Sequence, residues 1–414
     1  MRAVNLCRMT VVVCLLAAIC VLLPGCRDTL VSPEELDPEP REVVERTVIF
    51  YMAADNSLSN QVENDTTEMV KARHLIPKGV NVVIYLDDKT SKPAIYELSR
   101  AGGMKLWKRY EEELNSMDAD VMYDVLHTIK HYFPANHYGI TFWSHGTGWI
   151  PQKQSVRRKT FGEDWHRGSS ASGKLEMEIP ALRDVLAHFP KFDYIFFDAC
   201  FMQCIEVAYE LRNVTNYMVS SPAEIPGPGA PYHLIIDALC KGDAKGIVEG
   251  YGNGYPGTYN GFYYPGVLLS CIDCTQLEPL AIETGRLLTP FYMEHAEPYA
   301  TGFQSYCDLS WNRFTYCFDM RTTMCRLLSE EDYAAWLELY NKAVSSYKSL
   351  SNGWFAIHCQ TTDGVKTILA DPNCYGGVSM FVPMVKYDNN NCSWNQDFQQ
   401  TSWYQALGWG LTGW

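Results

Sequence analysis

Short runs of apolar residues alternate along this chain with longer segments in which apolar residues recur at helical spacing. The runs are apolar at successive positions, as expected of strands buried on both faces of a parallel sheet. They comprise Thr47–Met52, Val80–Leu86, Tyr138–Trp143, Tyr194–Phe197 and Tyr217–Ser220. Helices are predicted between them at Leu58–Arg73, Asp120–His131 and Pro180–Phe189. Strands that alternate with crossover helices indicate an α/β fold with a mostly parallel central sheet.

The pattern changes after about residue 265. We expect a further strand at Val267–Cys271, a helix-rich stretch at Leu277–Leu350 and a late strand at Gly376–Val382. No internal repeat and no Gly/Ser-rich linker divides residues 46–414. This region is therefore predicted to be one unit, with a core at 46–265 and a C-terminal part at 266–414 that packs on it.

The first 26 residues have the features of an export signal. Arg2 and Arg8 precede the apolar stretch Met9–Leu23, which has the length of a signal-peptide core and is short for a membrane-spanning helix of about 20 residues. It ends in Leu23-Pro24-Gly25-Cys26, which resembles a bacterial lipobox, so cleavage would leave Cys26 as a lipid-bearing N-terminus. Simple secretion and a retained membrane anchor are the alternatives.

Residues 27–45 predict a solvated tether, because they repeat proline and acidic residues, as in Asp37-Pro38-Glu39-Pro40. We therefore expect the protein in the bacterial cell envelope, lipid-anchored on the periplasmic or the cell-surface side, or secreted. Contact with a membrane is expected through the N-terminal lipid only.

Composition narrows the classes of partner. The chain has 414 residues, 47% of them hydrophobic, and carries 34 Lys+Arg against 48 Asp+Glu, a formal net charge of -14. Such a chain can bury a large core but offers no basic field for nucleic acid.

Removal of Cys7, Cys14, Cys20 and Cys26 from the 15 cysteines leaves 11, an odd number, so at least one thiol should be free. Cys271 and Cys274 have the spacing of a redox or metal pair, but we interpret them as small apolar residues at the end of a strand.

Candidate chemistry lies where two predicted strands end. The strand from Tyr138 runs into Ser144-His145-Gly146-Thr147-Gly148, and the strand from Tyr194 runs into Asp198-Ala199-Cys200. Ligands of open α/β sheets bind beyond the carboxyl ends of the strands, so the two ends could face each other across a crevice. A helical pattern follows Cys200, which predicts its sulfur at a helix N-terminus, where the dipole favours the thiolate. His145 would accept the thiol proton and return it to a leaving amine, and Gly146 and Gly148 would let backbone N–H groups approach an oxyanion. No residue is fixed by sequence to orient His145.

In joint order and spacing the sequence resembles the clostripain-like cysteine peptidases, relatives of caspases, gingipains and legumains. The matching residues are Tyr51-Met52-Ala53-Ala54-Asp55-Asn56-Ser57-Leu58, Trp143-Ser144-His145-Gly146-Thr147-Gly148-Trp149, Asp198-Ala199-Cys200, Ser221-Pro222-Ala223-Glu224-Ile225-Pro226-Gly227-Pro228-Gly229 and the closing run Thr401–Trp414. The resemblance spans about residues 46–414. It implies a caspase-like three-layer α/β/α sandwich with a helix-rich C-terminal extension.

The resemblance also implies roles for individual residues. His145 and Cys200 would form the catalytic dyad, and Gly146 with the Cys200 backbone N–H would form the oxyanion site. Family members mostly cleave after Arg or Lys, and Asp198 matches an acid of the pocket for the residue before the cut (P1). Ser221 and Glu224 are further candidate substrate-binding residues. A second acid usual in the family is replaced by Pro228, so a neutral or small P1 residue is an alternative, as is a structural role for Asp198 as a helix N-cap or a hydrogen-bond partner of a loop.

Members of this family are often matured by cleavage between the His and Cys strands. The interval here contains Arg157, Arg158 and Lys159, so we predict self-processing after one of them, giving a two-chain monomer; an uncut loop is the alternative. No cofactor is expected. Calcium activates some family members, but no segment here has EF-hand spacing, so no metal is assigned.

Three functions compete at this point. The first is an endopeptidase that acts on peptide or protein substrates through an acyl-enzyme on Cys200. The second is a non-catalytic peptide-binding lipoprotein on the same fold, which the retention of Cys200, His145 and the glycines argues against. The third, a flavodoxin-like redox protein, lacks the expected phosphate-binding loop.

Overall fold

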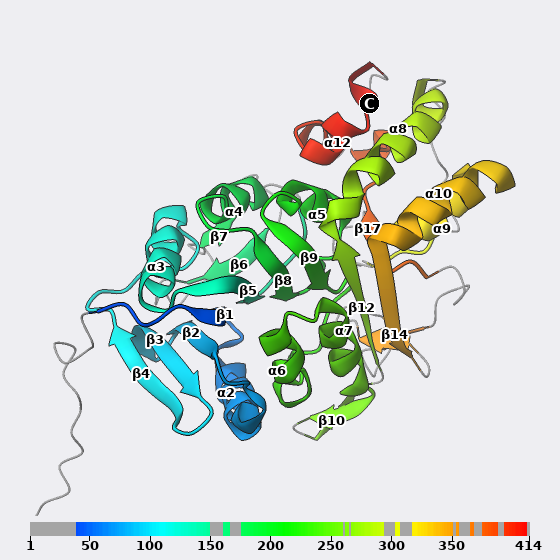
Figure 1. Ribbon diagram of the computed structural model, residues 1–414. Coiled ribbons are helices and arrows are strands. Elements are labelled where there is room, and N and C mark those ends of the chain that lie inside the picture. Colours follow the sequence, from blue (N-terminus) through cyan, green and yellow to red (C-terminus); the bar gives the residue numbers. More distant parts are fainter. Residues whose placement is uncertain are drawn as a thin grey trace, which may run out of the picture. The chain divides into compact units, whose positions relative to one another are not determined.

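The computed structural model describes residues 39–149, 160–165, 175–259, 261–264, 266–293, 303–306, 317–350, 353–355, 365–367, 375–387 and 393–411. A nine-stranded sheet runs through the unit formed by residues 39–414 (Figure 1). Its strands, from one edge to the other, are β14 (Val344–Leu350), β12 (Gly266–Asp273), β9 (Thr215–Ser220), β8 (Phe192–Asp198), β5 (Ala135–Trp143), β1 (Val44–Ala54), β2 (Val80–Asp88), β3 (Ser91–Ser99) and β4 (Gly103–Arg109).

The five central strands, β9, β8, β5, β1 and β2, pair in parallel. Antiparallel pairs flank them on both sides, β12 and β14 at one edge and β3 and β4 at the other. Most residues of the central strands are buried, as the continuous apolar runs predicted. The prediction of an α/β fold with a mostly parallel sheet is confirmed.

Helices cover both faces of the sheet (Figure 1). On one face lie α3 (Ala119–Tyr132), α4 (Ile179–Leu186) and α5 (Ile205–Leu211), and on the other α2 (Val62–Ala72), α6 (Tyr232–Lys241) and α7 (Ala244–Asn253). The second layer packs on alternate residues of the strands. The ring of Phe50 on β1, for example, meets Tyr232 of α6 edge-on at 5.5 Å between centroids. A three-layer sandwich results, as the family resemblance implied.

The five central strands and the three helices predicted between them are all present, and so is the strand that follows residue 265. The β3–β4 hairpin and helices α6 and α7 were missed. Two expectations for the C-terminal part were wrong in detail. Val344–Leu350 is a strand that pairs with β12, where a helix was expected, because it completes the edge of the sheet. The late strand is only β17 (Ser379–Met380), which pairs with β13 (Phe318–Asp319) outside the central sheet.

The C-terminal part packs against the segment that follows Cys200. It contains α8 (Leu277–Met293), α9 (Met320–Leu327), α10 (Glu330–Ala343), α11 (Trp394–Phe398) and α12 (Ser402–Ala406). The Ser379 N–H donates to the Gln203 carbonyl at 3.0 Å, and the Phe381 N–H donates to Glu206 Oε1 at 2.8 Å. The buried amide of Gln203 in turn donates to the Ser270 hydroxyl on β12 at 2.8 Å. Segments far apart in sequence therefore fix the backbone just after Cys200.

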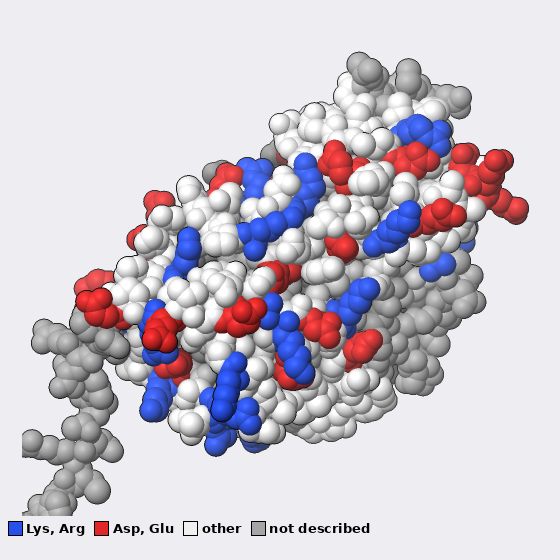
Figure 2. Space-filling view, viewed as in Figure 1, with Lys and Arg blue, Asp and Glu red and all other residues white. Residues whose placement is uncertain are grey.

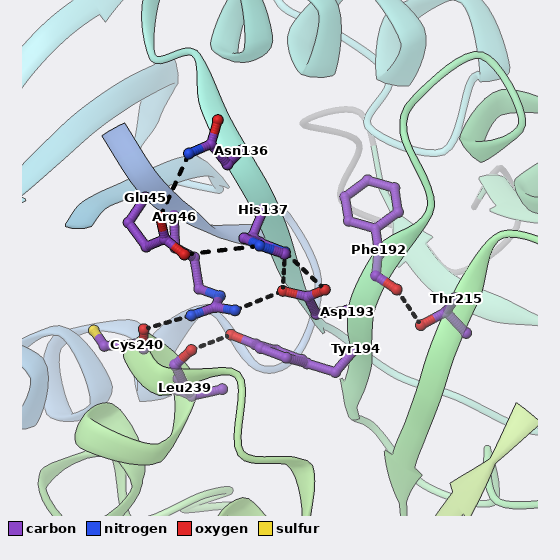
Figure 3. Close-up of polar contacts among 10 residues, drawn as sticks. All are labelled: Glu45, Arg46, Asn136, His137, Phe192, Asp193, Tyr194, Thr215, Leu239 and Cys240. Carbon is purple, nitrogen blue, oxygen red and sulfur yellow. Dashed lines mark hydrogen bonds and ion pairs between the residues drawn. The ribbon is translucent and has the colours of Figure 1, made fainter. Parts of the chain in front are cut away.

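Polar groups join the amino ends of three central strands (Figure 3). These ends, called the amino edge below, are opposite the carboxyl ends, where the candidate site lies. Arg46 on β1 donates to Asp193 Oδ2 on β8 at 2.6 Å and to the Cys240 carbonyl at the end of α6 at 3.3 Å. His137 on β5 lies 3.2 Å from the same carboxylate and 3.7 Å from Glu45. This amino-edge network, defined as Glu45, Arg46, His137 and Asp193, links β1, β5 and β8 through side chains.

Among the residues that the structure describes, no helix is both long and apolar enough to cross a membrane. The predicted signal segment and Cys26 lie outside the described residues. The seven cysteines within them, Cys271 and Cys274 included, are all free thiols. On the face shown in Figure 2, acidic and basic side chains are interspersed, with no basic field.

Candidate functional site

The register of the sheet brings His145 and Cys200 to the same end of the sheet, just beyond the carboxyl ends of β5 and β8. Strands β5 and β8 pair in parallel with Trp143 opposite Asp198, so His145 and Cys200 each lie two residues beyond a paired position. Gly146, next to His145, packs directly on the turn that contains Cys200. A Cβ built at this glycine would lie 2.7 Å from the Cys200 carbonyl oxygen. Only glycine permits this approach of the two backbones.

Cys200 lies in a tight turn rather than at the start of a helix. Helix α5 begins at Ile205 with Cys204 as its N-cap, so the prediction of a thiol stabilised by a helix N-terminus was wrong. The turn is sharp enough to hold Phe201 at φ 60°, a left-handed conformation that is uncommon for a residue other than glycine. Strain of this kind clusters at functional sites.

The surroundings of Cys200 favour the neutral thiol. Burial, and after it the negative charges of Glu224 and Asp198, raise the pKa of Cys200 to about 12. The Ile225 N–H opposes them, because it donates to the sulfur at 3.4 Å. A nucleophile in this setting needs a base that removes its proton during attack.

His145 contacts a side chain that the sequence analysis did not assign. Its Nε2 lies 2.8 Å from the hydroxyl oxygen of Ser57, just beyond the carboxyl end of β1. A hydrogen bond at one ring nitrogen fixes the ring's orientation and selects the tautomer at the other. Ser57 belongs to the Tyr51–Leu58 motif that carried the family resemblance, so the motif was a signal, although its contact partner could not be read from sequence.

The loop that carries Ser57 is tied to the loop that carries His145. The buried amide of Asn56 donates to the carbonyls of Ala53 and Glu163, at 2.9 and 2.8 Å, and its oxygen accepts from the Leu58 N–H at 2.9 Å. The Ser144 hydroxyl donates to the Ala53 carbonyl at 2.8 Å. The Ser57 hydroxyl is therefore held beside the imidazole by a buried network.

A short strap, residues 160–165, lies along the His145 loop. The Thr147 N–H donates to the Thr160 carbonyl at 3.1 Å, and the Gly162 N–H donates to the His145 carbonyl at 2.8 Å. Within the strap, β6 (Phe161–Asp164) pairs with β7 (Leu175–Met177). The strap thus holds the backbone of the His145 loop in place.

Asp198 is buried beneath the Cys200 turn, and hydroxyl groups surround it. Its Oδ2 accepts from the Ala230 N–H at 3.0 Å and from the Tyr232 hydroxyl at 2.7 Å, and its Oδ1 accepts from the Tyr251 hydroxyl at 3.3 Å. Burial raises the pKa of Asp198 to about 6, against the lowering effect of these hydrogen bonds. The residue is not a helix N-cap, since α5 begins well after it.

A second buried acid lies behind Asp198 and was missed. Asp65 on α2 accepts a hydrogen bond from the Trp143 indole N–H at 2.7 Å. Its pKa is raised well above its ordinary value, first by burial and then by the charge of Asp198. Its only sequence signal is a position on the inward face of α2. Burial therefore favours the neutral form of Asp65, and of the two acids it is Asp198 whose charge acts on the Cys200 thiol.

The remaining predicted site residues differ in their setting. Ser221 is buried, its hydroxyl accepts from the Ala223 N–H at 3.1 Å, and its carbonyl accepts from the Gln203 N–H at 3.0 Å. Glu224 is partly exposed beside Cys200. Pro228 lies in the turn closed by the Gly229 N–H and the Pro226 carbonyl at 2.9 Å. Arg157, Arg158 and Lys159 lie outside the described residues, within which no cluster of metal-ligating side chains is found.

Comparison with known proteins decides the family. A sequence model of the clostripain family matches residues 50–413. The chain belongs to the clostripain family. It is therefore a C11 cysteine peptidase with the α/β fold of the solved C11 proteases.

The solved structures it resembles cover most of its length. One is a secreted C11 cysteine protease from Bacteroides thetaiotaomicron in complex with an irreversible peptide inhibitor, with a TM-score of 0.74 and 31% identity over 88% of this chain and 99% of that one. Another is an inactive zymogen C11 protease from Parabacteroides distasonis, with a TM-score of 0.72 and 25% identity over 89% and 99%. Clostripain of Hathewaya histolytica is 24% identical over 226 residues, 47% of this chain. That match spans only 42% of clostripain's own length.

Proposed function

We propose that this C11 peptidase is an endopeptidase in which Cys200 is the nucleophile and His145 the acid–base catalyst. The observation that carries the proposal is the register of β5 and β8, which brings both residues to one edge with Gly146 seated against the Cys200 backbone. The peptide-inhibitor complex of the Bacteroides relative supports a peptide substrate.

The reaction follows from the setting of the thiol. Because the pKa of Cys200 is raised, His145 takes its proton as the sulfur attacks the scissile carbonyl carbon. The Gly146 and Cys200 N–H groups donate to the oxyanion of the tetrahedral intermediate. His145 then protonates the leaving amine, and water hydrolyses the thioester. In the tautomer whose Nε2–H donates to the Ser57 hydroxyl, Nδ1 of the neutral ring accepts the thiol proton.

Arg or Lys is the proposed P1 residue. Asp198 supplies a carboxylate beneath the Cys200 turn with which a cationic side chain can pair, and the hydroxyls of Tyr232 and Tyr251 hold that carboxylate in place. Pro228 contributes no second acid in the neighbouring turn. A neutral or small P1 residue is the alternative specificity.

We also propose self-processing after Arg157, Arg158 or Lys159, which fits the proposed P1 preference. The two products would stay associated, since β5 precedes and β8 follows the cut and the two strands pair. The zymogen form of the Parabacteroides relative supports a maturation step. Export and lipid attachment at Cys26 complete the proposal for location.

The deciding experiment measures turnover of a peptide library varied at P1, with residues 27–414 as wild type and as Cys200→Ala. We expect cleavage after Arg or Lys, lost by at least about 10³-fold in Cys200→Ala. Covalent capture of Cys200 by a peptidyl electrophile should accompany it. Absence of both turnover and capture in the wild type would favour the non-catalytic peptide-binding lipoprotein, and Cys200-dependent turnover after another residue would overturn the P1 assignment alone.

A further inference from the structure

Thr160, a buried residue of the strap, contacts two other segments, one through its backbone nitrogen and one through its hydroxyl. Thr160 is 4% exposed. Its N–H donates to Thr147 Oγ1 at 2.6 Å, and its hydroxyl donates to Glu176 Oε2 on β7 at 2.8 Å. The nitrogen and the hydroxyl oxygen of one threonine are three covalent bonds apart, so the carboxylate that accepts from the hydroxyl is a candidate partner for a charged amine at this nitrogen.

We propose that Thr147 and Glu176 form a binding site for the α-ammonium group that a cut after Lys159 creates at Thr160. The inference rests on the proposed self-processing. Hydrolysis of the Lys159–Thr160 bond adds water, leaving a carboxylate on Lys159 and a protonated amine on Thr160. The amide N–H thus becomes a cation with three donors, placed beside an acceptor hydroxyl and a carboxylate.

The surroundings make this contact strong. Charge-assisted hydrogen bonds are shorter and stronger than neutral ones, and a buried pair is screened less than a pair on the surface. The ammonium can keep the bond to Thr147 that the amide already makes and add one to Glu176. The cut therefore replaces a covalent tether of the strap by an ion pair.

The site matters because of what the strap holds. Thr147 is two residues beyond His145, and the strap accepts from the Thr147 N–H and donates to the His145 carbonyl. A frayed strap would release one side of the His145 loop. Docking of the new terminus keeps that loop in place in the two-chain enzyme.

The three proposed cutting sites differ in the terminus that they create. A cut after Arg157 or Arg158 leaves Thr160 as an internal residue with an ordinary amide, so no ammonium forms at the site. Only a cut after Lys159 produces the docked terminus. Mass spectrometry of the second chain of the wild-type enzyme should find Thr160 as its first residue, and a chain that begins at Arg158 or Lys159 would overturn the inference for the natural enzyme.

The site itself can be tested without self-processing. In a Cys200→Ala chain, residues 155–159 are replaced by Asp-Asp-Asp-Asp-Lys, and an exogenous protease specific for that sequence frees Thr160. The rate of acylation of its α-amino group is then measured in the folded protein, with Glu176 intact and as Glu176→Gln. We expect the terminus to react about tenfold more slowly with Glu176 present, the size of effect that a hydrogen bond to a charged group supports.

A matched chain with one glycine inserted before Thr160 is the control. Its new terminus lies one residue outside the site and should react at the fast rate whether residue 176 is Glu or Gln. Equal rates for Thr160 in the Glu176 and Glu176→Gln chains would overturn the binding site, whatever the wild-type enzyme does to its own loop.

Discussion

The two ends of strands β1, β5 and β8 are built on opposite principles. At the amino ends, Arg46 and Asp193 pair at 2.6 Å with His137 beside them, so the charges compensate each other (Figure 3). At the carboxyl ends, acids are buried next to one another, and burial raises the pKa of Asp65 and Asp198. The Cys200 turn adds a strained Phe201. The compensated charges at the amino ends stabilise the sheet, whereas the buried acids and the strained turn at the carboxyl ends cost stability, as is common at functional sites.

The largest expected effect at the carboxyl edge comes from Gly146→Ala. The added Cβ would lie 2.7 Å from the Cys200 carbonyl oxygen and 2.9 Å from the Ala199 Cβ, so the two turns must separate. Displacing the proposed oxyanion donor, the Gly146 N–H, should lower kcat by about 10²- to 10³-fold. Steady-state kinetics with the best P1 substrate measures it. Gly410→Ala, where a Cβ meets nothing within 4 Å, is the matched control and should keep full activity.

Asp198→Asn should change specificity more than folding. The amide keeps the size of the side chain but removes the charge, so kcat/KM for Arg or Lys at P1 should fall by about 10²-fold, with a far smaller change for a neutral P1 residue. An equal loss for both substrate classes would remove Asp198 from the P1 pocket.

The same carboxyl predicts the pH dependence of substrate binding. The folded-state pKa of Asp198, about 6, is above its ordinary value of 3.8, so the group becomes neutral as the pH falls through about 6. KM for a basic P1 residue should therefore rise below pH 6 in the wild type. In Asp198→Asn this rise should be absent, since no proton is gained there.

The contrast between the two edges also explains what sequence could predict. The central strands are continuous apolar runs, so the sheet, and with it the joint position of His145 and Cys200, followed from local pattern. The contact of Ser57 with His145 and the acid behind Asp198 depend on which helix packs on which face. The environment of the thiol was misjudged because four residues, 201–204, separate Cys200 from the start of α5, and because burial raises the pKa of the thiol.

A smaller effect is expected from Ser57→Ala. Loss of the contact with Nε2 should lower kcat about five- to tenfold with little change in KM, because the ring would sample the wrong orientation and tautomer without losing the substrate. The pH–rate profile should shift as well, and Ser57→Thr should restore most of kcat. A change confined to KM would mean that Ser57 contacts substrate and does not position His145.

The smallest effect on turnover is expected at the amino edge. Asp193→Asn leaves the mostly buried guanidinium of Arg46 without its charge partner, which should lower the free energy of unfolding by about 1–3 kcal/mol. Because Asp193 lies at the amino end of β8 and the proposed catalytic residues lie beyond the carboxyl ends of the strands, kcat/KM of the folded enzyme should stay unchanged. Urea unfolding and kinetics on the same sample test both parts. A matched loss of kcat/KM would show that the amino edge also holds the geometry of the catalytic edge, so that the two could no longer be treated as separate.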